Sequence, residues 1–103
     1  MLAPYATPVL MEAFARTIAR VEPRVLALRV RELLSVDATA ALARVTQPVL
    51  YLRGQHDRLV PERAVRQIME TLPSVKVARI AAPHALLQTA PRTTWDAIAA
   101  LLR

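Results

Sequence analysis

The 103-residue sequence contains no cysteine, a single glycine and no apolar run near the length of a membrane span. Without cysteine there are no disulfides and no thiolate chemistry, which fits a reducing compartment. A helix needs about 20 consecutive apolar residues to cross a bilayer, so no contact with a membrane is expected. The N-terminal stretch MLAPYATPVLMEAF has no basic region and is interrupted by prolines, which disfavours a signal peptide. The expected location is therefore cytoplasmic.

Aromatic residues make up only 4% of the chain, although its formal net charge is +6. Thirteen of the fourteen basic residues are arginines, and they are spread singly rather than gathered in a block. Proteins that bind single-stranded nucleic acids stack bases on aromatic side chains in a basic groove, and neither feature is evident here. A solvated basic surface is expected and no nucleic-acid partner, with a small basic nucleic-acid binder as a weaker alternative.

The hydrophobic and charged content, 54% and 21%, indicates a globular chain of at most one domain. Three helices are expected before any strand, over residues 7–21, 23–34 and 37–44. Thr7 and Asp37 are suitable N-caps for the first and third, and Pro23 is suited to the first turn of the second. Each helix has an apolar face at helical spacing, which predicts that this face is buried.

After Gln47 the pattern changes from helical to extended. The run PVLYLRG, residues 48–54, predicts a strand buried on both faces, and SVKVARIAAP, residues 74–83, predicts a second strand. A helix over residues 61–72 connects them, and a last helix begins with Thr93 or Thr94 as its cap. Two strands joined by a crossover helix are expected to be parallel. The fold class is thus α/β, and two strands alone would form the edge of a larger sheet.

Two residues with acid–base chemistry follow the two predicted strands. Asp57 comes after the first strand and His84 after the second, and the carboxyl ends of parallel strands meet at one edge of a sheet. A carboxylate there can accept the Nδ1 proton of a histidine and stabilise the imidazolium form. Gly54 would let the chain turn sharply out of the strand. Considered alone, Asp57 could instead be a turn former and His84 an ordinary loop histidine.

The stretches PVLYLRGQHDRLVP and APHALLQTAP resemble the C-terminal part of the α/β-hydrolase superfamily. That family has a strand ending in glycine, then two residues, the triad aspartate, and an entry to a helix of the form Leu-Val-Pro. The triad histidine follows the next strand. The resemblance covers residues 45–103 and implies that Asp57 and His84 are catalytic. It also implies a helical cap-like segment with a lead-in helix over residues 1–46, then a β-α-β-α core part over residues 47–103.

The nucleophile expected of this family is missing. Its elbow, G-x-S-x-G, needs glycines around a serine, but the only glycine here precedes Asp57. Ser35 and Ser74 lie in no such motif. The family also most often has glycine before the histidine, where this chain has Pro83, whose ring fixes its own backbone φ angle. The chain alone is therefore expected to be inactive unless another segment supplies the serine.

Two functions stay open at this point. The first is the C-terminal portion of an esterase-like serine hydrolase that acts on a small-molecule ester or acyl substrate, with no cofactor. The second is a non-catalytic interaction module derived from such a hydrolase, which self-associates through the unpaired edge of its first strand. His56 is a further histidine near Asp57, but its spacing does not favour a metal site, so no metal is expected.

Overall fold

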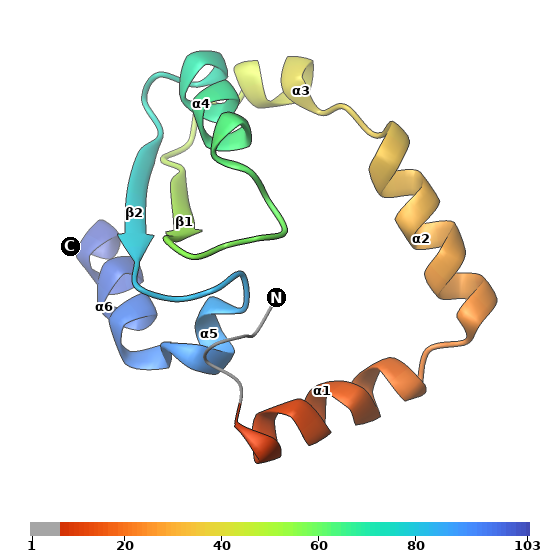
Figure 1. The fold of residues 1–103 in the computed structure, drawn as a ribbon. Helices are drawn as coiled ribbons and strands as arrows, with labels where there is room; N and C mark the ends of the chain where they lie inside the picture. Colours follow the sequence, from red (N-terminus) through yellow and green to blue (C-terminus); the bar gives the residue numbers. More distant parts are fainter. Residues whose placement is uncertain (1–6) are drawn as a thin grey trace.

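A computed structural model describes residues 7–103, and residues 1–6, which begin the expected cap-like segment, lie outside the described part. Helices and strands follow one another around an open arrangement, with the strands in the second half of the chain (Figure 1). In chain order the elements are α1 (Pro8–Ala19), α2 (Pro23–Ser35), α3 (Thr39–Ala43), β1 (Leu50–Gly54), α4 (Glu62–Thr71), β2 (Lys76–Ile80), α5 (Leu86–Thr89) and α6 (Pro91–Leu102).

The two strands form a parallel sheet, as the sequence predicts. Leu50 pairs with Lys76 at one end of the sheet and Gly54 with Ile80 at the other, and α4 forms the crossover. Both strands therefore end at the same edge. The loop that carries Asp57 and the loop that carries His84 leave from this edge side by side.

A small core lies between the sheet and the helices of the second half of the chain. It contains four buried apolar side chains, of which Val65 in α4 and Ala82 after β2 are fully inaccessible to solvent. Helix α6 packs against both strands and also against α5, while α3 packs against α4. Thr94 in α6 is fully buried as well. The core therefore fixes β1, β2 and the loops at their carboxyl ends.

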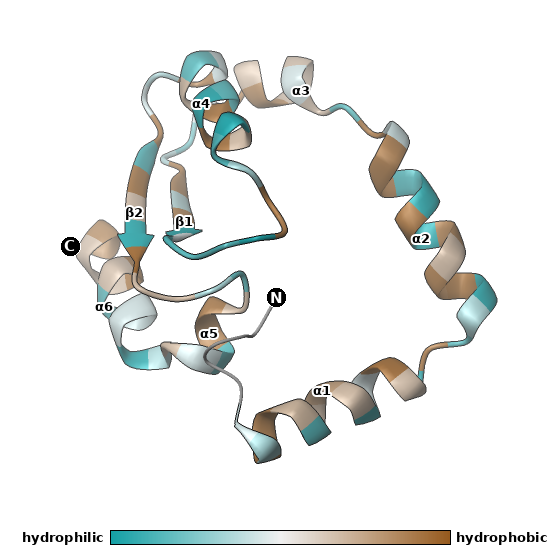
Figure 2. Ribbon diagram, in the orientation of Figure 1, coloured by the Kyte–Doolittle hydropathy of each residue, from teal (hydrophilic) through white to brown (hydrophobic). Residues whose placement is uncertain are grey.

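The first two helices form where the sequence predicts them but do not bury the predicted faces. The Thr7 hydroxyl caps α1 by accepting a hydrogen bond of 3.1 Å from the Leu10 N–H. Neither α1 nor α2 contains a buried residue, and Leu33 and Leu34 are 73% and 84% exposed. Hydrophobic and hydrophilic residues alternate along both helices, and both helices lie apart from the sheet (Figure 2). The radius of gyration, 15.6 Å, exceeds the value of about 13 Å typical of a compact 100-residue domain.

Several local predictions are wrong. Helix α6 begins at Pro91 after Ala90, rather than at Thr93 or Thr94, and the short helix α5 was not expected. Asp37 precedes the cap position, which Ala38 occupies, although its carboxylate accepts a hydrogen bond of 3.0 Å from the Thr39 N–H. The first strand is half-buried over Leu50–Leu52 rather than buried on both faces. Within residues 7–103, no helix has the length and apolar character to cross a membrane.

Candidate active site

Asp57 lies in a loop that the end of β2 holds in place. Beyond the strands, the Gln55 N–H donates to the Ile80 carbonyl at 2.8 Å, and the His56 N–H donates to the Ala82 carbonyl at 3.1 Å. The Asp57 N–H then donates to the Gly54 carbonyl at 3.2 Å, which closes a tight turn. Only 6% of the Asp57 side chain is exposed. The carboxylate is thus directed by backbone hydrogen bonds that continue the sheet.

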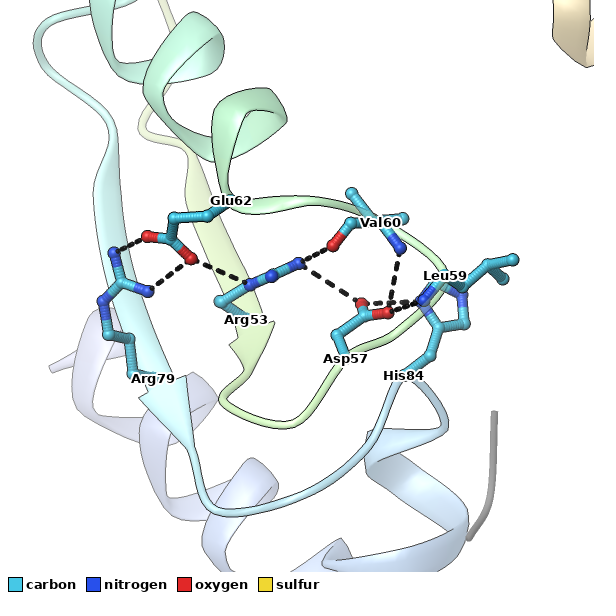
Figure 3. A network of polar contacts seen from close by, with 7 residues as sticks. All are labelled: Arg53, Asp57, Leu59, Val60, Glu62, Arg79 and His84. Atoms are coloured by element: carbon cyan, nitrogen blue, oxygen red, sulfur yellow. Dashed lines mark hydrogen bonds and ion pairs between the residues drawn. The ribbon is translucent and has the colours of Figure 1, made fainter.

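The two oxygens of the Asp57 carboxylate have different partners (Figure 3). Oδ1 accepts hydrogen bonds from the Leu59 N–H at 2.8 Å and the Val60 N–H at 3.0 Å. Such bonds from an aspartate to the backbone two and three residues later are typical of turns. The sequence LVP after the acid therefore supplies the two amides that hold Oδ1, which leaves Oδ2 to meet other groups.

His84 meets this second oxygen. Its Nδ1 atom lies 2.9 Å from Asp57 Oδ2, and 39% of its side chain is exposed. The loop from β2 reaches this position through Ala82 and Pro83, both buried. The structure thus brings together the two residues that the strand ends were expected to bring together. Because Nδ1 faces the carboxylate, Nε2 is the ring nitrogen left for another partner.

The pKa of Asp57 is lowered. Burial is the largest single influence and raises the pKa, but the hydrogen bonds from Val60, His84 and Leu59, together with the electrostatic attraction of His84, lower it by more. Each of these donors favours the charged form of the carboxylate. Asp57 is therefore ionised throughout the neutral range and can stabilise a positive charge on a neighbouring imidazole.

Gly54 is required for close packing rather than for a left-handed backbone. A Cβ atom at this position would lie 2.7 Å from the Ala82 carbonyl oxygen and closer still to that of Pro83. These are backbone atoms of the segment that delivers His84. The absence of a side chain thus lets the two site loops approach each other, which corrects the expectation that the glycine serves mainly to turn the chain.

Among solved structures, the crystal structure of E-2-(acetamidomethylene)succinate hydrolase, an α/β-hydrolase, is similar to this chain. The two share 30% sequence identity with a TM-score of 0.63, and the match covers 67% of this chain. The chain has the fold of the C-terminal part of an α/β-hydrolase. It spans 26% of the length of that hydrolase. No protein-family model matches the sequence, and no curated protein sequence matches it.

Neither of the two serines, Ser35 and Ser74, lies beside His84. The Ser35 hydroxyl donates to the Glu32 carbonyl at 3.2 Å, at the end of α2. Ser74 lies in the turn before β2, whereas His84 follows β2. A five-residue strand at about 3.3 Å per residue separates these two positions by roughly 16 Å.

His56 is exposed in the same loop as Asp57. Among residues 7–103, no group of three or more His, Cys, Asp or Glu forms a metal site.

A buried arginine, which the sequence pattern did not predict, lies beside this pair. The Arg53 side chain is only 5% exposed, and its Nη1 atom lies 3.5 Å from Asp57 Oδ2. Nη1 also donates a short hydrogen bond to the Val60 carbonyl. The available signal was an arginine within an apolar strand, directly before the glycine, because a charged residue in such a position needs a partner.

Proposed function

We propose that this chain supplies the acid–base pair of an α/β-hydrolase active site, with Asp57 as the orienting carboxylate and His84 as the general base and acid. The observation that carries the proposal is the contact of 2.9 Å between His84 Nδ1 and Asp57 Oδ2 at the carboxyl ends of parallel strands. The similarity to a hydrolase of this fold supports the same role. We further propose the division into a cap-like segment over residues 1–46 and a core part over residues 47–103.

The reaction would be acyl transfer to water. Asp57 accepts the Nδ1–H hydrogen bond of His84, and Nε2 takes the proton of a serine hydroxyl while its oxygen attacks the acyl carbon. The imidazolium then gives that proton to the leaving group as the bond from it to the acyl carbon breaks. Water deprotonated by Nε2 attacks the resulting ester in the same way and releases the acid. A serine outside the described residues would supply the nucleophile.

The substrate class would be a small-molecule ester or a related acyl compound. The similar structure is named for a substrate that contains an acetamido group, in which an acyl group is attached to nitrogen. Amides therefore belong in the same assay as esters. p-Nitrophenyl acetate and p-nitroacetanilide carry the same acyl group, so their rates compare oxygen and nitrogen leaving groups directly.

A chimera tests the proposal. The aligned part of this chain replaces the corresponding part of E-2-(acetamidomethylene)succinate hydrolase, and ester hydrolysis is measured. Turnover is expected, and Asp57→Asn should lower kcat by about 10⁴-fold, as the equivalent change does in a Ser-His-Asp triad. His84→Ala should abolish it, while the matched loop variant His56→Ala should retain it. A chimera that folds by circular dichroism but shows no turnover contradicts the proposal, as does full activity in the Asp57 variant.

A second test uses the chain by itself. A fluorophosphonate probe labels activated serines, and neither Ser35 nor Ser74 lies at the strand end that carries His84. No labelling is expected on incubation with the purified chain. Labelling of either serine would contradict the assignment of the nucleophile to another segment.

A non-catalytic interaction module is the second candidate function, and the exposed apolar residues of α1 and α2 favour it. Within residues 7–103 the sheet has only two strands, so β1 also has an edge that no other strand covers. Such edges pair readily with other chains. Light scattering that shows a defined oligomer, together with an inactive chimera, would support this function. A monomer at all concentrations would contradict it.

A further inference from the structure

We infer that Arg53 is a positioning residue for Asp57, which fixes the carboxylate so that Oδ2 faces His84. The inference rests on the proposed role of the Asp57–His84 pair. Arg53 is the penultimate residue of β1, and its guanidinium extends along the loop that carries Asp57 (Figure 3). It touches the acid and the loop backbone rather than His84, so it would act through Asp57.

The contacts of Arg53 form a closed ring with Asp57 and Val60. Nη1 donates to the Val60 carbonyl and lies 3.5 Å from Asp57 Oδ2. The N–H of the same Val60 donates to Asp57 Oδ1 at 3.0 Å. The backbone of Val60 is therefore held at its carbonyl by Arg53 and at its N–H by Asp57. A rotation of the carboxylate away from His84 would break contacts at both of its oxygens.

Burial makes this ring a strong constraint. The Arg53 and Asp57 side chains are 5% and 6% exposed, and a buried charge is costly unless it is paired and hydrogen-bonded. The Arg53 Nε atom has no hydrogen bond to any described residue and lies 3.5 Å from Glu62 Oε2, which is itself 45% exposed. Asp57 and the Val60 carbonyl are thus the buried partners of this guanidinium, and removing Arg53 leaves the Asp57 carboxylate with fewer restraints.

A purely structural role for Arg53 makes a different prediction from a positioning role. Arg79 belongs to the same network and donates to Glu62 at 2.6 Å and 3.2 Å, but the structure shows no contact between it and Asp57 among the described residues. Arg79→Gln therefore removes a charged partner from the network without touching the acid. It serves as the matched control for Arg53→Gln.

The experiment measures the tautomer of His84 by ¹⁵N NMR in the purified chain, at a pH where imidazole is neutral. In the wild-type chain and in the Arg79→Gln variant, which keeps Arg53, His84 should be the Nδ1–H tautomer, because that hydrogen faces Asp57. In Arg53→Gln the ratio of the Nδ1–H to the Nε2–H tautomer should fall by about 2- to 10-fold, the range expected for loss of one hydrogen bond. An unchanged ratio in folded Arg53→Gln, or an equal fall in Arg79→Gln, overturns the inference.

A measurement on the wild-type chain covers the case in which Arg53→Gln does not fold. The Nη resonances of Arg53 should shift as Asp57 is protonated at acid pH, because Nη1 lies beside Oδ2. Resonances that do not respond to Asp57 overturn the inference. Neither measurement needs turnover, so an inactive chimera with a changed tautomer ratio would refute the proposed function and leave the positioning role standing.

Discussion

Arg53 and Arg79 face each other as direct partners across the parallel sheet, and Glu62 contacts both guanidinium groups (Figure 3). Like charges opposite each other destabilise a sheet. Glu62 is the first residue of the crossover helix α4. Its carboxylate reaches both arginines near the carboxyl end of the sheet. One carboxylate thus offsets the repulsion between two arginines that the register places side by side.

Glu62→Gln should therefore destabilise the chain, because it leaves the two arginines without their shared carboxylate. The hydrogen bond from Arg79 is the main cause that lowers the pKa of Glu62. The loss of unfolding free energy should shrink as the salt concentration rises, since salt screens exposed charges. Urea unfolding at low and high salt measures this change.

Glu70→Gln is the matched control, since Glu70 is exposed on the same helix near its C-terminal end. Removing a negative charge there should be neutral or slightly stabilising, because the helix dipole disfavours anions at that end. Equal losses in the two variants would contradict the shared-carboxylate explanation.

Gly54→Ala should destabilise the chain by about 1–3 kcal/mol, the usual range for overpacking a buried position. The added methyl group would meet the carbonyl oxygens of Ala82 and Pro83, which belong to the backbone and cannot rotate away. The same displacement should weaken the contact between His84 and Asp57. Thermal unfolding and the His84 tautomer ratio report the two effects separately. Gln55→Ala, at the next and exposed position, should change neither, and a stable Gly54→Ala with an unchanged tautomer ratio would contradict the packing argument.

The parallel sheet and the contact between Asp57 and His84 could be predicted from short stretches of the sequence. The proline and glycine around PVLYLRG mark the strand, and the parallel crossover places both strand ends at one edge. These features depend on short-range geometry and on a general rule of chain connection. The fold class could be predicted for the same reason, and the similarity to an α/β-hydrolase structure supports it.

The main predictions that failed concern burial. Burial depends on contacts with other parts of the structure, and the spacing of apolar residues does not identify those contacts. An apolar stripe on α1 or α2 predicts a buried face, but it does not say which surface covers that face, and within the described residues it stays exposed. The burial of Arg53 depends on the cross-strand register and on the carbonyl of Val60, which come together only in three dimensions. The catalytic roles of Asp57 and His84 stay predictions.

Hydrogen exchange should divide the chain into two parts. Amides of α1 and α2 are expected to exchange much faster than those of β1 and β2, because these helices bury no residue and short isolated helices are marginally stable in water. Mass spectrometry of peptides after brief deuteration measures this at low protein concentration. Protection of α1 equal to that of β1 would contradict the expectation. Protection that rises with concentration would instead indicate self-association through these helices.

The Asp57 carboxylate should make stability depend on acid pH. Its pKa is lowered in the folded chain, so between that value and the ordinary aspartate value of about 3.9 the unfolded chain binds more protons. The stabilisation from Asp57 is therefore complete above about pH 4 and is lost as the pH falls through the folded-state pKa. In Asp57→Asn this part of the pH dependence should vanish.

The measurement is urea unfolding of the wild type and Asp57→Asn between neutral pH and pH 2. The difference in unfolding free energy between the two should stay constant above pH 5 and shrink steadily below pH 4. Asp37→Asn is the control, because Asp37 also has a lowered pKa, caused mainly by the Thr39 hydroxyl, but is fully exposed. Its difference from the wild type should be smaller because solvent screens the exposed charge. A wild-type minus Asp57→Asn difference that does not change with pH would show that the hydrogen bonds from Leu59, Val60 and His84 do not favour the ionised carboxylate.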